Sequence, residues 1–471
     1  MRSRWLLRGV VTSWLILSGV VAARPQYGGA IRIEMESALR TVDPAAAPID
    51  ASDAAARAHL LPLVFETLVT VDRDACLTPL LAVSWEHDAR AARWRFRLRP
   101  GAKSHDGRVI DAAQVAAALR SQEAGWRTAA DGDAVVIEAD REMPDLLWQL
   151  ADLRYAVALR RPTGELAGTG PFRIERLDSK SLLLRAHEEH WNGRPFVDTV
   201  QVDMARAPSD QMASFEAGRA DLIAVRPVDA ARTPSRGRLL SSRPREFVGV
   251  IFEDTHVGAS SDSLRRALTL AIDRGSLSTV LLQRHAEPAA SVLPDWLSGY
   301  AAMFQSHHDV ATARALVGAL PPASRTLALR VDSSNAVDRA VADRIAVDAR
   351  EAGLSIRVDP ADALAPRPDM RLVRLRLEAS SPERALASAL AGLGSRLSRL
   401  LAAEPVPGPG TPIEDVYKYE RHLIERRVIV PIAHLPELYA VSGRVDSASG
   451  PIVFPSGTWD LANVYVRDRN P

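Results

Sequence analysis

The stretch GTGPFRIERLDSKSLLLRAHEEHWNGRPFVDTVQV, which runs from Gly168 to Val202, decides the fold. Its two glycines and the proline that follows them favour a turn, and the apolar run Leu182–Leu184 is typical of a strand. Asn192 and Gly193 favour a second tight turn, because both residues tolerate the backbone angles of hairpins. The stretch therefore predicts a turn, a strand, a hairpin and another strand.

The first residues of the chain have the order of a secretory signal peptide. Three arginines precede an apolar run from Gly9 to Val21, and the small residues Ala22 and Ala23 follow. A helix that spans a bilayer needs roughly 20 apolar residues, so this run is too short for a permanent anchor. We expect residues 1–23 to be a signal peptide that exports the chain to the periplasm.

Length and charge restrict the class of protein. The chain has 471 residues, which exceeds the roughly 250–300 residues at which a single hydrophobic core stops growing. Its 59 basic and 58 acidic residues leave a net charge of +1, which disfavours nucleic acid as a partner. We expect a globular protein of two or more lobes that does not bind nucleic acid.

Cys76 is the only cysteine of the sequence, so an intramolecular disulfide is excluded. It lies far from the expected cleavage point and cannot be the lipid-modified first residue of a lipoprotein. Because Leu77 and Leu80 are nearby, we expect Cys76 to be a small buried hydrophobe. A monomer that diffuses freely in the periplasm, without a lipoprotein cysteine, fits these features.

Two segments near the N-terminal end have clear periodicity. The segment Arg93–Arg99 alternates apolar and arginine side chains, which predicts a strand with one packed face. Apolar residues at helical spacing predict a helix from about Asp53 to Leu68, with Pro62 as a disturbance within it. These segments predict a mixture of helix and strand.

Two further helices are indicated by their caps. Asp111 precedes Gln114 at the spacing of a capping box, which predicts that a helix starts there. A helix from about Asn335 to Ala352 stops at Gly353 and is followed by alternating apolar residues. A helix followed by a strand indicates α/β packing in the second half of the chain.

The histidine-rich motifs do not predict a metal centre. Zinc peptidases need histidines four apart on one helical face, whereas the HEEH motif His187–His190 has a spacing of three and follows a strand-like run. The adjacent His307 and His308 point in different directions on either type of element. Asp and Gly in the SHDG motif Ser104–Gly107 predict a turn. We expect no metal, no cofactor and no catalytic residue.

Four long segments, in the right order, resemble a known family. Besides Gly168–Val202, they are GGAIRIEMESALRTVDP from Gly28, the stretch Leu63–Leu119, and LRRALTLAIDR at Leu264–Arg274. Together they resemble the family 5 extracellular solute-binding proteins, the peptide and nickel receptors of bacterial ABC importers. The resemblance extends over nearly the whole chain after the signal peptide.

The resemblance implies an α/β fold of the two-lobed periplasmic binding protein type, type II and cluster C-like. Hinge strands would join the lobes, and the first lobe would carry an inserted subdomain. The expected divisions are lobe I from residues 24–57, 165–246 and 428–471, the inserted subdomain from residues 58–164, and lobe II from residues 247–427.

The resemblance also points to one stretch of the ligand site. Peptide receptors of the family hold the ligand's ammonium group with an aspartate in a stretch like Gly-Trp-x-Ala-Asp-Tyr-x-x-Pro, which falls here on RLRLEASSP. Glu378 stands in place of that aspartate, and Arg376 lies two residues before it. Arg374, Leu375 and Ala379 replace the glycine, tryptophan and tyrosine of the pattern, which departs from receptors of ordinary peptides.

Two other segments are candidates for contact with a ligand. Pro48, Ile49 and Asp50, which follow the TVDP motif, match another ligand-lining stretch of the family. Trp459 would either stack on a ligand or pack within the first lobe.

The resemblance implies a periplasmic substrate-binding protein without chemistry of its own. It would capture a peptide or a similar small solute between its lobes and deliver it to an ABC transporter permease in the inner membrane. One alternative is a diverged receptor of the same fold that acts as a sensor or as a scaffold for a partner. Another is a secreted hydrolase, which is disfavoured because the sequence offers no ordered set of nucleophile, base and acid.

Overall fold

The structure is a computed structural model. It describes the following residues: 26–72, 76–88, 92–123, 125–232, 237–253, 262–332, 335–360, 368–377, 381–393, 405–408, 410–454 and 456–467. The expected signal peptide, residues 1–23, lies outside these ranges.

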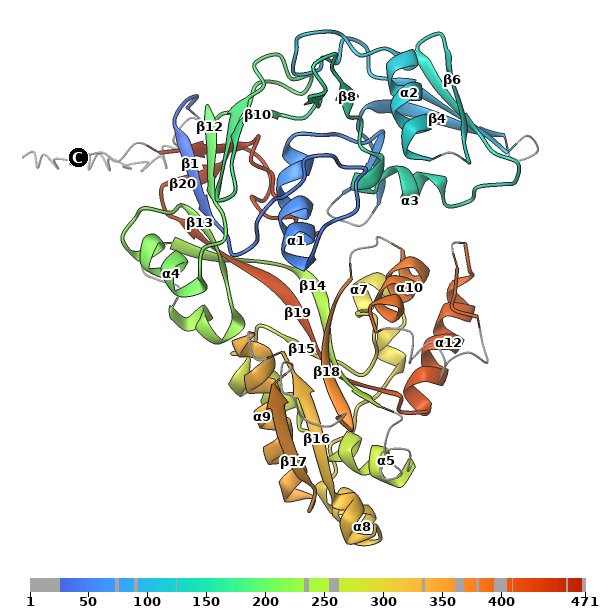
Figure 1. The fold of residues 1–471 in the computed structure, drawn as a ribbon, viewed down its shortest axis with the longest axis vertical. Helices are drawn as coiled ribbons and strands as arrows, with labels where there is room; N and C mark the ends of the chain where they lie inside the picture. The colour runs from blue at the N-terminus through green and yellow to red at the C-terminus, as the bar shows by residue number, and fades with distance from the viewer. Residues whose placement is uncertain are drawn as a thin grey trace, which may run out of the picture.

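Two lobes lie one above the other and are joined by two long strands, β14 and β19 (Figure 1). The bounds of these strands are Gly237–Phe252 and Ile429–Ser442. Among the described residues, the largest sheet has eleven strands and passes through both lobes in the order β10-β11-β12-β1-β13-β19-β14-β18-β16-β17, with β15 (Glu287–Pro288) beside β19. The predicted α/β, two-lobed fold is confirmed.

The upper lobe contains the half of this sheet to which the stretch Gly168–Val202 contributes three strands. Its strands are β10 (Phe172–Leu177), β11 (Ser181–Ala186), β12 (Thr199–Asp203), β1 (Ala30–Glu34) and β13 (Leu222–Val225). Strands β10, β11 and β12 are antiparallel neighbours, as the turn, strand and hairpin pattern predicts, and β1 runs parallel to β12 and β13. Helix α4 (Pro208–Glu216) and the hairpin of β20 (Val445–Ser447) and β21 (Val464–Val466) complete this lobe.

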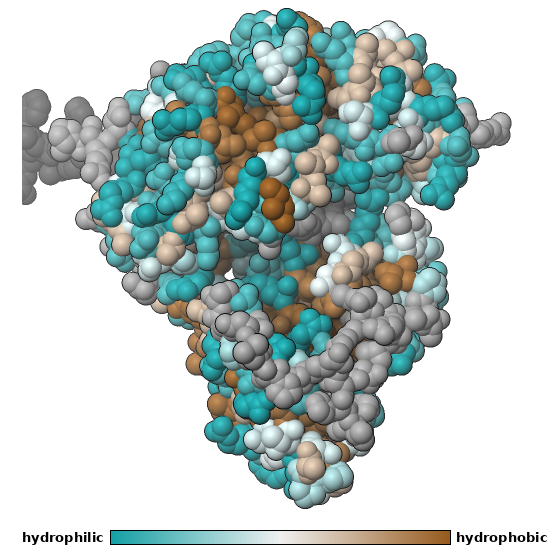
Figure 2. All heavy atoms as spheres, viewed as in Figure 1, coloured by the Kyte–Doolittle hydropathy of each residue, from teal (hydrophilic) through white to brown (hydrophobic). Residues whose placement is uncertain are grey.

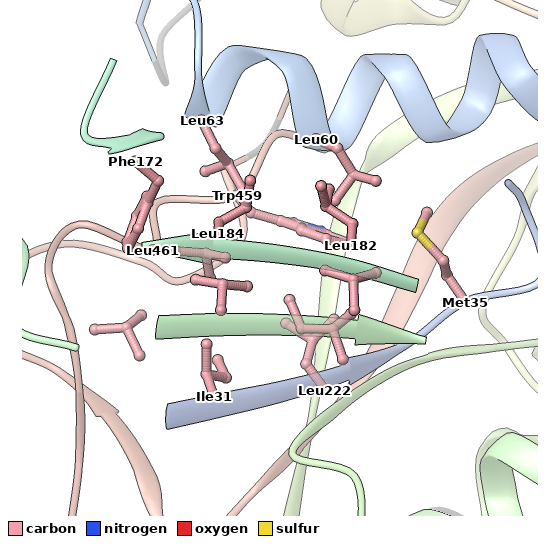
Figure 3. Packing of buried hydrophobic residues seen from close by; sticks show 14 of the residues in the cluster. Ile31, Met35, Leu60, Leu63, Phe172, Leu182, Leu184, Leu222, Trp459 and Leu461 are labelled. Atoms are coloured by element: carbon pink, nitrogen blue, oxygen red, sulfur yellow. The ribbon is translucent and has the colours of Figure 1, made fainter. Parts of the chain in front are cut away.

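The core of the upper lobe lies between helix α1 (Ala51–Leu60) and the sheet. In Figure 3, Leu60 and Leu63 face Leu182 and Leu184 of β11, and Trp459 lies between the helix and the strands. Helix α1 ends earlier than the predicted Leu68, because Pro62 lacks an N–H group and its ring obstructs a continuing α-helix. The chain instead makes a 3-10 turn from Leu61 to Leu63.

A smaller unit with its own hydrophobic core occupies the right of the upper lobe in Figure 1. It has a four-stranded antiparallel sheet of β4 (Ala82–Asp88), β5 (Arg93–Leu98), β7 (Ala134–Glu138) and β6 (Arg127–Asp131). This sheet is surrounded by two helices, α2 (Ala112–Gln122) and α3 (Leu146–Leu150). Two short strand pairs also lie beside it: β2–β3 (Val69–Val71, Leu77–Pro79) and β8–β9 (Leu159–Arg160, Leu166–Ala167). The strand prediction is confirmed, since Trp94 and Phe96 of β5 are buried, and both hydrogen bonds of the Asp111 capping box are present.

Cys76 lies in the turn before β3 and is exposed. Its N–H donates to Asp72 Oδ1 at 2.9 Å, and its carbonyl oxygen accepts from the Asp72 N–H. The expectation that Cys76 is buried was wrong.

The lower lobe packs helices on both faces of β18 (Met370–Arg376), β16 (Thr326–Val331) and β17 (Ser355–Pro360). Its helices are α5 (Asp262–Ala271), α6 (Arg274–Ser276), α7 (Asp295–Ser298), α8 (Val310–Gly318), α9 (Ala336–Glu351), α10 (Pro382–Gly392) and α12 (Ile413–Glu425). Asn335 caps α9 and Gly353, with a φ of 92°, follows its end, as predicted. Across the described ranges, every helix is too short or too polar to cross a bilayer.

The two long strands lose their regular pairing where they pass between the lobes. Pro244 and Pro436 face each other in the register, and the register shifts between Ser241 and Pro244 and again before Glu246. Proline has no N–H group, so neither residue can donate a ladder hydrogen bond at this point. We call residues 241–246 and 435–437 the hinge, because the ladder between the two long strands is interrupted there.

A buried carboxyl group holds the loop before α7 in the lower lobe. Glu420 of α12 is fully buried, and its Oε1 accepts the N–H groups of Val292 and Leu293 at 2.5 and 3.0 Å. The Tyr300 hydroxyl donates to Oε2 at 2.6 Å. Burial raises the pKa of Glu420 to about 7, although these three hydrogen bonds act in the opposite direction.

The pKa of Glu420 predicts that its contribution to stability depends on pH. A carboxyl group with a folded pKa near 7 and an unfolded pKa of 4.5 stabilises the fold fully below pH 4.5, and this contribution is lost as the pH rises through 7. Relative to Glu420→Gln, the wild type should lose about 3 kcal/mol between pH 4.5 and pH 8. Denaturant unfolding of both proteins at the two pH values measures this difference, and an unchanged difference would contradict it.

Candidate functional site

Six side chains from both lobes meet at the hinge. They are contributed by α1, β14, β18, β19 and the loop before β21, and we call them the hinge cluster: His59, Arg245, Arg376, Glu437, Tyr439 and Trp459. Figure 2 shows a broad upper lobe above a narrower lower lobe, and in Figure 1 β14 and β19 run between them. The cluster therefore lies at the junction between the two lobes.

Glu437 is the centre of the hinge cluster, with 12% of its side chain exposed. Its Oε1 lies 2.7 Å from Arg376 Nη1 and 3.7 Å from His59 Nε2, and the Tyr439 hydroxyl donates to Oε2 at 3.2 Å. Burial alone would raise the pKa of Glu437, but His59, Arg376 and Arg245 outweigh burial and lower the pKa to about 2. The carboxylate is therefore ionised in a largely buried position and links side chains of both lobes.

Three aromatic rings pack beside this carboxylate. His59 and Trp459 are stacked with their ring centroids 4.8 Å apart, and Tyr439 meets Trp459 edge-on at 5.8 Å. Trp459 is only 6% exposed and belongs to the core of the upper lobe. Of the two roles expected for Trp459, the structure supports packing within the first lobe.

The loop that carries Trp459 also closes over Glu437. Gly457 has a φ of 80°, and a Cβ at this position would overlap Glu437 Oε2 and lie 3.2 Å from Arg245 Cδ. Glycine is required at this position for both its backbone angle and its lack of a side chain. The carboxylate is thus enclosed from the side of the C-terminal loop.

The structure brings together some of the residues that the sequence predicts as ligand contacts and separates others. Arg376 and Trp459 both belong to the hinge cluster. Pro48, Ile49 and Asp50 are exposed and lie just before the start of α1. His59 lies near the other end of this helix, about 14 Å from Asp50 by the rise per residue of an α-helix. Asp50 caps α1 by accepting the Asp53 N–H and pairs with Arg40 at 3.4 Å. Glu378 lies outside the described residues.

Sequence reasoning missed Glu437, His59 and Tyr439 as members of a site. Glu437 lies in the run VIVPIAHLPELYAV, in which it is the only acidic residue of an otherwise largely apolar strand. A charged residue in such a strand needs a buried partner, and this is the signal that would have found it. His59 has no comparable signal, because its partners come from the other end of the chain.

The histidines of the HEEH and SHDG motifs lie in a second polar cluster, where the small unit joins the upper lobe. His105 Nε2 and His187 Nδ1 both lie near the Gly170 carbonyl oxygen, at 3.0 and 3.2 Å, and His190 Nε2 is 3.1 Å from Glu66 Oε1. Burial lowers the pKa of His105 to about 4. These histidines hold the loop at Gly170 in place, and among the described residues no group of three or more His, Cys, Asp or Glu side chains could hold a metal ion.

The charged side chains of the hinge cluster pair with one another. Ionised side chains are held by hydrogen bonds in a largely buried position, where charges interact more strongly than in water. The hydroxyl group of Tyr439 is hydrogen-bonded to the Glu437 carboxylate and to His59. Burial raises the pKa of Tyr439, which opposes the use of this hydroxyl as a nucleophile. The arrangement can hold and orient charged groups.

The chain resembles proteins that bind solutes outside the cell. Residues 77–372 match the bacterial extracellular solute-binding proteins, family 5 Middle. The nickel-binding periplasmic protein of Escherichia coli is 23% identical over 62% of this chain and 65% of its own length, and the glutathione-binding protein GsiB of Pectobacterium atrosepticum is 22% identical over 67% and 64%. The chain thus spans less than two thirds of the length of each of these curated relatives.

Solved structures of the same fold cover almost all of the chain. The ABC transporter substrate-binding protein CtaP of Listeria monocytogenes superposes with a TM-score of 0.79 over 94% of this chain and 100% of that protein, at 16% sequence identity. Such a likeness establishes the shared fold. The matching family and these neighbours are binding proteins rather than enzymes, and they are named as periplasmic, extracellular or transporter components.

Proposed function

The chain belongs to the bacterial extracellular solute-binding proteins of family 5, and on this premise we propose that it captures a solute between its lobes for an ABC importer. The solute would be a peptide or a similar small molecule, and the partner would be a permease in the inner membrane. The protein would bind and release its ligand unaltered, as a monomer. Residues 1–23 would export it to the periplasm.

The observation that supports this proposal most is the way in which the lobes are joined. Each lobe has a separate hydrophobic core, and the strands that connect them lose their regular pairing at Pro244 and Pro436. Such a connection permits closure of one lobe on the other around a ligand. In this proposal, lobe I consists of residues 24–57, 165–246 and 428–471. Residues 58–164 form its inserted subdomain, and residues 247–427 form lobe II.

The chemistry of the ligand follows from the hinge cluster and from the segment next to it. Arg376 is the last residue of β18 and is 22% exposed in its side chain, while Glu437 neutralises it at 2.7 Å. Glu378 follows two residues later and would supply a further carboxylate for an ammonium group. Three relatives are named for binding glutathione, for peptide transport and for binding nickel, which supports a charged ligand beside Arg376 and Glu378.

Mass spectrometry of the native protein, freshly purified from the periplasm, tests the proposed function. We expect a retained small molecule, and a panel of oligopeptides, amines and metal chelates should contain at least one compound that raises the melting temperature. A ligand at about 100 times its dissociation constant adds roughly 2.7 kcal/mol of stability. If no compound binds, the proposal of a diverged sensor or scaffold replaces import, and turnover of any compound would establish an enzyme.

Replacing Glu378 with glutamine should weaken binding of amine-bearing ligands about ten-fold or more, because a hydrogen bond to a charged group contributes about 1.5–3 kcal/mol. Calorimetry of the wild type and Glu378→Gln measures the change. The same ligand with its amine blocked is the matched control and should bind both proteins equally. Equal affinities for the free amine would contradict the role of Glu378.

A further inference from the structure

An ion pair joins the lobes at a place other than the hinge. Arg384 Nη2 of α10, in the lower lobe, lies 2.5 Å from Asp145 Oδ2 at the start of α3, in the small unit of the upper lobe. Each element is anchored in its own core, α3 through Leu146 and Leu150 and α10 through other apolar side chains. Figure 1 shows α3 directly above α10, on the side of the molecule to the right of the crossing of β14 and β19.

Neither residue has the local role that its position normally gives it. Asp145 is the N-cap residue of α3, but its side chain makes no capping hydrogen bond and is held instead by Gln149 Nε2 at 3.1 Å. Arg384 is the third residue of α10, where the positive end of the helix dipole disfavours a cation. The carboxylate of Asp145 offsets this unfavourable position, so the pair is built for contact between the lobes.

The pair is partly protected from solvent and is supported by a second contact. The side chains of Asp145 and Arg384 are 9% and 25% exposed. Next to Asp145, Pro144 approaches the lower lobe so closely that a Cβ at Gly410 would lie 3.3 Å from Pro144 Cγ. An ion pair in such surroundings is screened less by salt than one on an open surface.

We propose that the ion pair of Asp145 and Arg384 is a latch that stabilises the closed arrangement of the two lobes. A rotation at the hinge displaces groups far from the hinge more than groups within it, so opening must separate this pair while the hinge cluster stays together. Both arrangements belong to one equilibrium, and a contact made only in the closed arrangement shifts it toward closure. The latch rests on the proposed function, since it would raise the affinity for a ligand held between the lobes.

The distance between the lobes in the absence of ligand tests the latch directly. Spin labels at the exposed native Cys76, in the small unit, and at Val347→Cys on the exposed face of α9 report the distance across the molecule. We expect Asp145→Asn and Arg384→Gln to shift the distance distribution toward longer values, as should raised salt in the wild type. The exchange of both residues, Asp145→Arg with Arg384→Asp, should restore the shorter distances.

A matched control and a ligand measurement complete the test. Asp131→Asn breaks an ion pair with Arg95 inside the small unit, at 3.0 Å, and should leave the distances unchanged. For any ligand found by mass spectrometry, we expect the single latch variants to bind three- to ten-fold more weakly, through faster dissociation. Unchanged distances in both single variants, or no restoration in the exchanged pair, would overturn the latch. Shifted distances in a protein that binds no ligand would overturn the proposed function alone.

Discussion

Replacing Gly168 with alanine is expected to destabilise the fold strongly. A Cβ at this position would overlap the Val64 carbonyl oxygen and would lie 2.8 Å from the Val64 carbonyl carbon and 3.0 Å from His105 Cε1. The obstacle is backbone rather than a flexible side chain, so the loop would have to move as a whole. Movement would break the hydrogen bonds of His105 N–H to Gly168 O and of Gly170 N–H to Val64 O.

We expect a loss of about 3 kcal/mol or more from this substitution, which is at the upper end for a single added methyl group. Thermal unfolding and the soluble yield of purified protein measure it. Gly318→Ala is the matched control, because nothing lies within 4 Å of a Cβ in this helix and the change should be neutral or slightly stabilising. A melting temperature for Gly168→Ala equal to that of the control would show that the turn at Gly168 does not depend on close approach.

The predictable parts of this fold are those in which local pattern and tertiary environment agree. The stretch Gly168–Val202 forms the antiparallel strands that its turns and alternation predict, and the Asp111 capping box begins the predicted helix. In each case a side chain or turn a few residues away determines the backbone. The prediction that helix α1 extends to Leu68 was wrong. It relied on apolar spacing that continues past Pro62, but the effect of proline on the backbone outweighed that spacing.

The hinge cluster could be predicted only in part. Arg376 was found because it lies within a stretch that resembles a ligand-binding segment, but the structure shows that Glu437 holds it. His59 and Glu437 are almost 380 residues apart in the chain, and no local pattern relates two residues at such a separation. The prediction that Cys76 is buried was wrong because it relied on neighbours in sequence. Apolar neighbours in the sequence do not guarantee that a side chain is packed in the fold.

Replacing Glu437 with glutamine is expected to destabilise the protein by about 3 kcal/mol at neutral pH. The change removes a largely buried carboxylate that lies 2.7 Å from Arg376 Nη1, and removal of one partner of a buried ion pair typically costs about 3–5 kcal/mol. The pKa of about 2 in the fold, against 4.5 in the unfolded chain, gives a similar magnitude. Calorimetric unfolding at pH 7 measures the loss.

The pH dependence separates this electrostatic origin from a simple packing defect. A carboxyl group with a lowered folded pKa stabilises the fold fully above pH 4.5, and its contribution is lost as the pH falls through about 2. The difference between wild type and Glu437→Gln should therefore be constant from pH 7 to about 5 and should shrink below pH 4.5, whereas a packing defect would leave it unchanged. Glu175→Gln, which breaks an exposed ion pair with Arg185, is the matched control and should leave the stability almost unchanged at any pH.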